Sequence, residues 1–175
     1  MIRPSAPAQG TVERETPPAA EPRTPRALAA VLALLLLAQF LSGMVVNLYV
    51  QIPQGHPGAT GSDYFQRLLH GVPWAVLHGG VPLQVHAALG LLLIVGALLL
   101  VVLAIGRRQR VWLVTALVGA GGLVGAGFNG GSFLNYGHAV SSLLMSLGFA
   151  VALAAYGVGL SVTRAARALI TPPLC

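Results

Sequence analysis

Charged residues are scarce in this chain: they make up 8% of its 175 residues, and lysine is absent altogether. A soluble globular domain carries roughly 25% charged residues, because they cover the surface that faces water. Here 55% of the residues are hydrophobic and the mean hydropathy is +0.78. So few charges cannot cover a surface in water, and the composition therefore predicts a protein whose solvent is a lipid bilayer.

Acidic side chains are rarer still. Glu13, Glu15 and Glu21 lie near the N-terminus, Asp63 lies in a polar loop, and no acid falls in a long apolar segment. No nucleophile–base–acid set can be assembled from such a sequence, which argues against a hydrolase. A proton-coupled transporter ordinarily needs a carboxylate inside the membrane, and that is also missing. We therefore expect no catalytic constellation, and a redox role is the one enzymatic possibility left open.

The single cysteine, Cys175, is the last residue, so no disulfide can form within the chain. All ten basic residues are arginines, and most lie in the N-terminal tail or between apolar segments. This placement is typical of the orientation signals of membrane proteins, and it does not form a nucleic-acid-binding stripe.

Four apolar segments, residues 27–50, 83–105, 111–128 and 138–162, dominate the sequence. Each has about 18–25 residues, enough at about 1.5 Å rise per residue to cross a hydrocarbon core of roughly 30 Å. Backbone polar groups in lipid must pair within the segment, so these are helices. The sequence predicts an all-α, polytopic membrane four-helix bundle over residues 27–162, with up-down-up-down topology. We expect the first segment to be a retained helix, because it is too long for a signal peptide.

The tails and the arginines predict the orientation of this bundle. Residues 1–26 are rich in Pro, Ala, Glu and Arg and predict a disordered tail, and residues 163–175 form a short C-terminal tail. Arginines precede the first helix, fill the turn between the second and third, and follow the fourth: Arg23, Arg26, Arg107, Arg108, Arg110, Arg164 and Arg167. The positive-inside rule then places both termini in the cytoplasm and loop 51–82 outside the plasma (inner) membrane.

The outer loop carries cap signals for two short interfacial helices. Ser62 or Asp63 can begin one that ends at Gly71, and Pro73 can begin another that ends at Gly79. We expect these helices to lie over the bundle as a lid. His70 and His78 then sit in last turns, where a histidine can meet free carbonyls. His56, in a Gly/Pro-rich stretch, is expected to be solvated.

Small and polar residues recur at helical spacing within the apolar segments. The spacing of three and four residues places each set on one helix face. Such faces mark either helix contacts or the wall of a cofactor or substrate cavity, and pairs such as Gly121/Gly125 and Ser142/Ser146 permit close helix approach. The faces are Gln39, Gly43 and Asn47; His86, Gly90 and Ala97; Thr115, Gly119, Gly122, Ala126 and Asn129; and His138, Ser142, Met145, Phe149 and Tyr156.

His86 and His138 each open a membrane helix on the outer side, at similar depth. Their two helices are diagonal in an up-down bundle, which is the arrangement that holds one porphyrin between two imidazoles. Gly90 and Ser142, each four residues further on, would leave room for the macrocycle. A histidine inside a membrane segment is a functional hypothesis by default, so His86 and His138 are candidate ligands of a haem iron. The alternative is that both imidazoles bind loop backbone at the interface.

The segments "LQVHAALGLLLIVGALLL" and "NYGHAVSSLLMSLGFAVAL" resemble the histidine helices of four-helix b-haem membrane proteins. The likeness is to one half of a haem A synthase and, more loosely, to cytochrome b561-type bundles. It implies His86 and His138 as axial ligands of a b-type haem. Haem A synthases carry a glutamate three positions before a histidine, where this chain has Leu83. Their outer-loop cysteine pair is also absent, which puts the synthase's chemistry in doubt.

Three hypotheses follow from the sequence. The first is a bis-histidine b-haem protein for membrane electron transfer or haem handling. The second is a non-enzymatic protein that packs against, or stabilises, a larger membrane complex, either with another membrane protein or as a homo-oligomer. The third is an outer metal site built from His70, His78 and His86, which is disfavoured because glycines and prolines break the helix between them.

Overall fold

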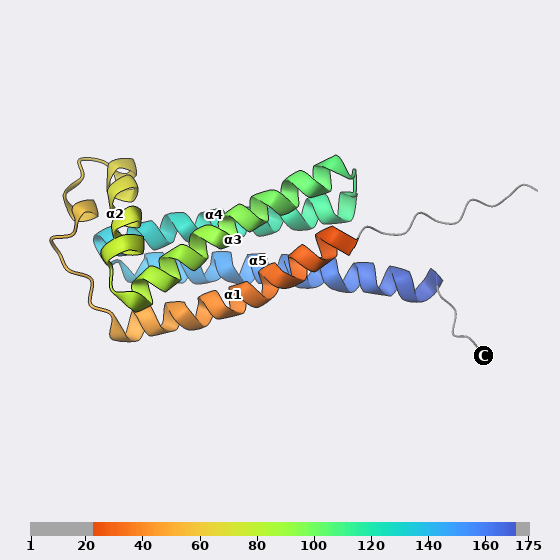
Figure 1. Ribbon diagram of the computed structural model, residues 1–175, viewed down its shortest axis with the longest axis horizontal. Helices are drawn as coiled ribbons and strands as arrows, with labels where there is room; N and C mark the ends of the chain where they lie inside the picture. The colour runs from red at the N-terminus through yellow and green to blue at the C-terminus, as the bar shows by residue number, and fades with distance from the viewer. Residues whose placement is uncertain (1–22, 171–175) are drawn as a thin grey trace, which may run out of the picture.

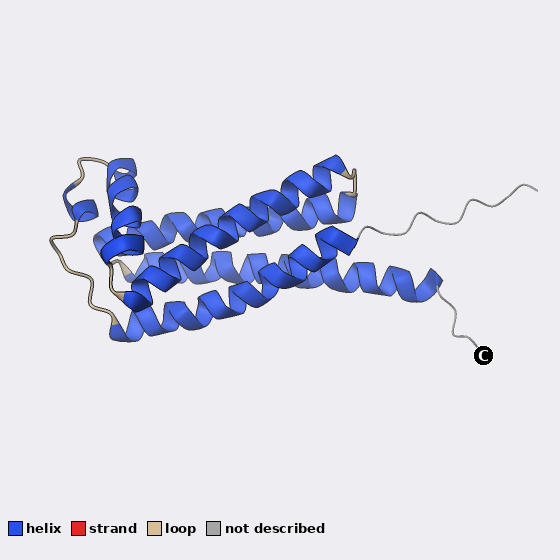
Figure 2. Cartoon of the chain, in the orientation of Figure 1, coloured by secondary structure: helices blue, strands red, loops and turns tan. Residues whose placement is uncertain are grey.

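The structure is a computed structural model that describes residues 23–170. It contains five α-helices and one short 3-10 helix, and the described part of the chain has no strand (Figures 1 and 2). The elements are α1 (Arg23–Tyr49), η1 (Pro57–Thr60), α2 (Tyr64–His78), α3 (Val81–Gly106), α4 (Arg110–Tyr136) and α5 (Ala139–Ile170). The predicted behaviour of residues 1–22 and the position of Cys175 lie outside the described residues.

The four long helices form an antiparallel bundle. α1 packs against α3 and α5, and α4 packs against the same two helices, so α3 and α5 are diagonal to one another (Figure 1). Turns of a few residues connect α3 to α4 and α4 to α5, which forces these neighbours to run in opposite directions. The predicted all-α bundle with up-down-up-down topology is therefore confirmed, including the diagonal placement of α3 and α5.

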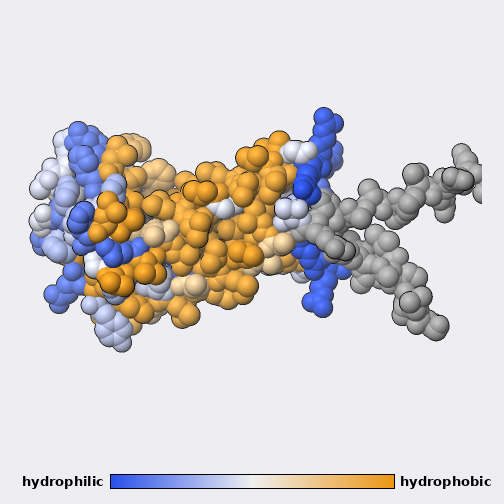
Figure 3. Space-filling view, viewed as in Figure 1, coloured by the Kyte–Doolittle hydropathy of each residue, from blue (hydrophilic) through white to orange (hydrophobic). Residues whose placement is uncertain are grey.

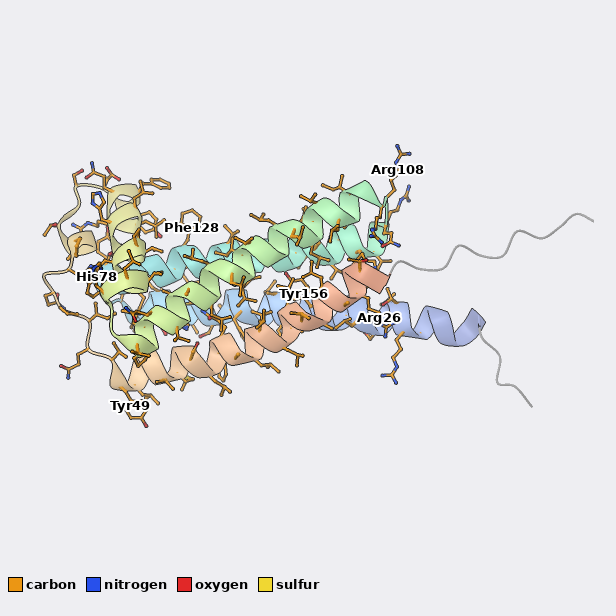
Figure 4. The ribbon with its side chains drawn as sticks, in the orientation of Figure 1. Arg26, Tyr49, His78, Arg108, Phe128 and Tyr156 are labelled. Atoms are coloured by element: carbon orange, nitrogen blue, oxygen red, sulfur yellow. The ribbon has the colours of Figure 1, made fainter. Side chains whose placement is uncertain are left out.

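Each long helix is apolar enough to cross a membrane. The four candidate spans are Thr24–Tyr49, Val81–Gly106, Arg110–Tyr136 and Ala139–Ala165. A broad apolar band covers the middle of the face shown in Figure 3, and hydrophilic residues lie at both ends of it. Arg26 and Arg108 lie at one end, whereas α2 lies across the opposite, capped end, where Figure 4 labels His78. The chain thus has the architecture of a multi-pass membrane protein.

Several helices run further than their apolar segments predict. α1 begins at Arg23, inside the predicted tail, and α5 continues to Ile170, beyond the predicted end at residue 162. α4 continues through "NGGSFLNY" to Tyr136, although the prediction ended it at residue 128. Packing overrides the low helix propensity of the two glycines there, because Gly131 lies against the Leu68 side chain of α2 and Leu134 is buried.

The cap consists of one continuous α2 and not the two predicted helices. Asp63 is its N-cap, as expected, and accepts a hydrogen bond from the Gln66 amide at 3.0 Å. The helix does not end at Gly71, which is buried and faces α4: a Cβ there would lie 2.8 Å from Asn135 Oδ1. Gly71 therefore serves close packing and not helix termination. The helix passes through Pro73, which lacks an N–H to donate, and ends at His78.

α4 and α5 touch through small residues. A Cβ on Gly122 would lie 2.6 Å from Gly148 O, and the ring of Tyr156 covers Gly119. Tyr156 is fully buried and lies among the helices in Figure 4. Where α4 and α5 meet, their small-residue faces are thus packing surfaces. Of the two alternatives that the sequence left open, helix contact is confirmed at this interface, and a cavity wall is not.

We expect Gly122→Ala to destabilise the bundle by about 1–3 kcal/mol, because the added methyl group must push the α5 backbone away. Gly121→Ala is the matched control: a Cβ at that adjacent position meets nothing within 4 Å. It should leave stability unchanged or raise it by up to about 1 kcal/mol through helix propensity. Reversible unfolding of the purified protein in mixed micelles measures both. Equal effects of the two substitutions would contradict the α4–α5 packing.

Candidate functional site

His86 is held by α1 within the bundle. Its Nδ1 lies 3.0 Å from Ser42 Oγ, and its Nε2 lies 3.4 Å from the amide nitrogen of Gln39. Gly43 lets the ring lie flat against α1, because a Cβ at that position would be 2.9 Å from His86 Cε1. The sequence-predicted faces of α1 and α3 therefore meet, and the imidazole joins the two helices.

One protonation pattern satisfies this cluster. The Ser42 hydroxyl donates to the backbone carbonyl oxygen of Gln39 at 2.9 Å. The hydroxyl oxygen of Ser42 is therefore free to accept another hydrogen bond. His86 then donates from Nδ1 to Ser42, and its bare Nε2 accepts from the Gln39 amide. Both ring nitrogens of a neutral imidazole are then hydrogen-bonded, whereas the side-chain oxygen of Gln39 is buried without a partner among the described residues. Such bonds across membrane helices stabilise the pair, because the alternative is an unpaired polar group in hydrocarbon.

His138 lies elsewhere. It is exposed, immediately precedes α5, and stacks on the Tyr136 ring with 5.9 Å between ring centroids. Its backbone carbonyl accepts from the Ser141 amide at 3.0 Å. His86 points to α1 while His138 is directed to the surface at the capped end, so the described geometry does not bring the two imidazoles to one site.

The residues around these histidines do not fit a haem in this arrangement. Gly90 was expected to leave room for a macrocycle, but its open face is filled by Gln39, whose Nε2 would lie 3.1 Å from a Cβ there. Ser142 is half-buried, and its carbonyl accepts a bond from Ser146. Bis-histidine ligation would require both imidazoles to leave their present partners. We therefore derive no haem chemistry from this geometry.

The disfavoured hypothesis of an outer metal site gains no support from the structure. His70 and His78 are exposed on α2, while His86 is bound to α1. Within residues 23–170, no three His, Cys, Asp or Glu side chains come together as metal ligands. His78 does occupy the last turn of α2, as expected. His70 does not end a helix, because α2 continues beyond Gly71.

His56 was predicted to be solvated, and this prediction is also wrong. Its side chain is 4% exposed and stacks on Trp74 of α2, with 4.9 Å between ring centroids. Its Nε2 donates to Leu134 O of α4 at 3.1 Å, and its Nδ1 accepts from the Gly58 amide at 3.2 Å. His56 thereby ties the 50–60 loop, α2 and the end of α4 together, and we call it the cap latch.

The cap has further anchors on α4. The Tyr64 hydroxyl donates to Phe128 O, and Gly58 packs against the Asn135 side chain. Burial raises the pKa of Tyr64 above its usual value, and the nearby Tyr136 adds to the shift. The hydroxyl therefore stays protonated and remains a donor throughout the physiological pH range. These contacts hold α2 across the end of the bundle as the predicted lid.

A hollow of about 230 Å³ lies beside the cap latch. The last turn of α1, the loop that follows it and the last turn of α4 enclose it. Its apolar walls include Val46, Val50 and Leu134, and its polar side chains are Asn47, Gln54, His56, Asn135 and Tyr136. Both amide atoms of Asn135 are buried without a hydrogen-bond partner among the described residues.

Sequence reasoning missed the latch and the hollow because their parts lie far apart in the chain. A local signal for His56 exists: it precedes a proline at the first position of η1, and its side chain caps that helix by accepting from Gly58. No local signal points to the contact with α4, whose predicted end fell short of Leu134.

Comparison with known proteins adds no relative: no family model, no curated protein and no solved structure matches this chain.

We expect His86→Ala to destabilise the protein by about 1–2 kcal/mol, because Ser42 and Gln39 lose their partner within the bundle. His138→Ala removes an exposed ring and should change stability by no more than about 0.5 kcal/mol. The same unfolding titration measures both variants. Destabilisation by His138→Ala equal to that by His86→Ala would contradict the roles assigned here.

We expect His56→Ala to loosen the cap while leaving the bundle intact, since it removes both latch hydrogen bonds and the stacking on Trp74. Amide hydrogen exchange should become faster in residues 50–78 and remain unchanged in the middle of α3. His70→Ala and His78→Ala are matched controls on the exposed side of α2. If all three variants exchange alike, His56 is not the latch.

Proposed function

We propose that the chain is a non-catalytic membrane protein that packs side by side with another membrane-spanning chain through α4. The glycine face of α4 carries this proposal. It points away from the bundle and consists of Val114, Leu117, Val118, Gly121, Val124, Gly125 and Phe128.

Among the described residues, the two glycines in this face make no close contact that requires glycine. A Cβ on Gly121 or Gly125 would meet nothing within 4 Å, whereas one on Gly119 or Gly122 would collide with α5. A glycine costs a helix about 1 kcal/mol relative to alanine. For Gly119 and Gly122, the close contact with α5 accounts for this cost. For Gly121 and Gly125, contact with a helix outside this chain supplies the reason.

The flanking residues suit such a contact. Leu117 and Val118 on one side of the glycines and Phe128 on the other are each between 43% and 53% exposed. They form ridges beside a shallow groove at the glycine pair, into which another helix can fit. In lipid, close van der Waals contact between helices drives association, and glycines four residues apart permit it.

We propose that both termini lie on the cytoplasmic side of the plasma (inner) membrane. The support is the position of the arginines. Arg26 and Arg108 lie at the end opposite the cap (Figure 4), and Arg107 and Arg110 belong to the same α3–α4 turn as Arg108. The described capped end contains Arg67 alone. Short cytoplasmic loops are enriched in such residues. The cap, the latch and the hollow would then face the outside.

Site-specific photo-crosslinking in native membranes tests the association. A photoreactive residue at Val118 should give a discrete protein adduct, whose mass tells a second copy from a different membrane protein. Gly121→Leu together with Gly125→Leu fills the groove and should reduce the adduct at least about tenfold, equivalent to 1.4 kcal/mol.

Matched controls lie on α5. A photoreactive residue at Val158, which is also exposed, should give no discrete protein adduct, and Gly157→Leu should leave the Val118 adduct unchanged. Adducts with lipid alone, or a protein adduct that does not depend on Gly121 and Gly125, would overturn the proposal.

A bis-histidine b-haem protein for membrane electron transfer or haem handling is the second candidate. His86 lies on α3, and His138 immediately precedes α5. The diagonal placement of these two helices favours this candidate. The present partners of both imidazoles weigh against it. We expect the protein purified in mild detergent to show no b-type absorption spectrum. A haem spectrum that is lost in both His86→Ala and His138→Ala would replace the packing function by this one.

A further inference from the structure

We infer that the hollow at the capped end is a binding site for a small, uncharged, hydroxyl-rich ligand such as a polyol or a monosaccharide. This site is distinct from the glycine face of α4, and it adds a ligand to the proposed function. Its size, its charge and its hydrogen-bonding groups support the inference in turn.

The size of the hollow sets the scale of the ligand. The volume of the hollow is about 230 Å³. This volume is below the range of about 300–1,000 Å³ that is usual for drug-sized ligands. A single sugar ring or a short polyol is of the right order, and a nucleotide or a haem is not.

The electrostatics disfavour an ion of either sign. None of the residues that line the hollow is Asp, Glu, Lys or Arg. α1 and α4 both end here, at Tyr49 and Tyr136, and the partial negative charge of two helix C-termini repels an anion. A cation would find no carboxylate among the lining residues to neutralise it. An uncharged ligand needs no charged partner.

The hydrogen-bonding groups favour hydroxyls. The last four carbonyls of a helix have no partner within it, so the ends of α1 and α4 supply acceptors. The hydrogen bonds from His56 and Gly137 already occupy the carbonyls of Leu134 and Phe133, respectively. The exposed side-chain amides of Asn47 and Gln54 both donate and accept. A hydroxyl also does both, and several on one small ligand can meet this mixed set.

Apolar side chains complete the site. Val46, Val50 and Ile52 form one wall, against which the C–H face of a sugar ring can pack. The hollow lies at the capped end, between the last turns of α1 and α4, which are diagonal in the bundle. Exposed polar residues such as Asn47 and Gln54 line it, so a free solute can reach it from water.

Hydrogen exchange on the full-length protein in detergent tests the inference, with myo-inositol and D-glucose as probes. Some amides can exchange only after the ligand has left the site. For these amides, about 10 mM of a ligand with a Kd of about 1 mM slows exchange about tenfold. We expect this protection in residues 46–60 and 133–137. Sugars excluded from protein surfaces slow exchange everywhere, so uniform protection would overturn the inference.

Two variants and one control keep the test specific. Asn47→Leu removes an exposed polar group of the hollow, and Ala59→Phe fills its space without removing a polar group. Each should abolish the local protection. Gln84→Leu alters an exposed amide that binds Leu77 O outside the hollow, and it should leave the protection unchanged. Protection that persists in both pocket variants would overturn the assignment.

Further probes decide the class and the source of the ligand. Choline tests for a cation site, and inorganic phosphate tests for an anion site. Local protection by either ion, without protection by myo-inositol or D-glucose, would overturn the inference. In nanodiscs, protection by a glucosyl lipid, with none by free glucose, would assign the site to a lipid headgroup. Protection by free glucose alone would assign it to a solute. No local protection by any probe, including the glucosyl lipid, would overturn the inference.

Discussion

Gly122 and Gly148 let the backbones of α4 and α5 meet, since a Cβ on either residue would come within 2.6 Å of the other's carbonyl oxygen. This contact aligns α4 with α5, the longest described helix, and the rest of the fold depends on that alignment. Held against α5, α4 continues to Tyr136, which brings Leu134 O within reach of His56. The cap and the hollow exist because α4 is long, and α4 is long because it is packed.

The need to pair polar groups in lipid explains the most notable histidine. Ser42 and Gln39 of α1 supply hydrogen-bond partners for both ring nitrogens of His86 on α3. An unpaired imidazole in hydrocarbon would cost several kcal/mol, and a nearby serine and amide remove that cost without a cofactor. The same histidine is therefore compatible with a structural role, although its position in a membrane helix first suggests a ligand.

The sequence predicted what depends on local periodicity and composition. The four spans, their antiparallel order, the α4–α5 faces and the Asp63 cap all follow from spacing along one segment. It could not predict what depends on contacts between segments. By sequence alone, Gly71 predicts the end of a helix, but its packing against Asn135 of α4 explains the glycine instead. His56 likewise predicts a solvated loop residue, because its partner Leu134 O belongs to a part of α4 that the sequence did not predict. The partners of His86 were equally hidden, because a face that carries Gln39 and Gly43 fits a cavity wall as well as a helix contact.

The two proposed sites occupy different parts of α4. Gly125 and Tyr136 are eleven positions apart on α4, or about 16 Å at a rise of 1.5 Å per residue. A helix seated on the glycine pair lies along the side of the bundle, whereas the hollow opens at its end. The two are nevertheless parts of one rigid helix, and Tyr64 binds Phe128 O, at the end of the glycine face nearest the cap. A partner that displaces Phe128 would therefore loosen an anchor of the cap, and through it the wall of the hollow. Association and ligand binding are separable by mutation at Gly121 and Asn47, and Phe128 is the residue through which they would be coupled.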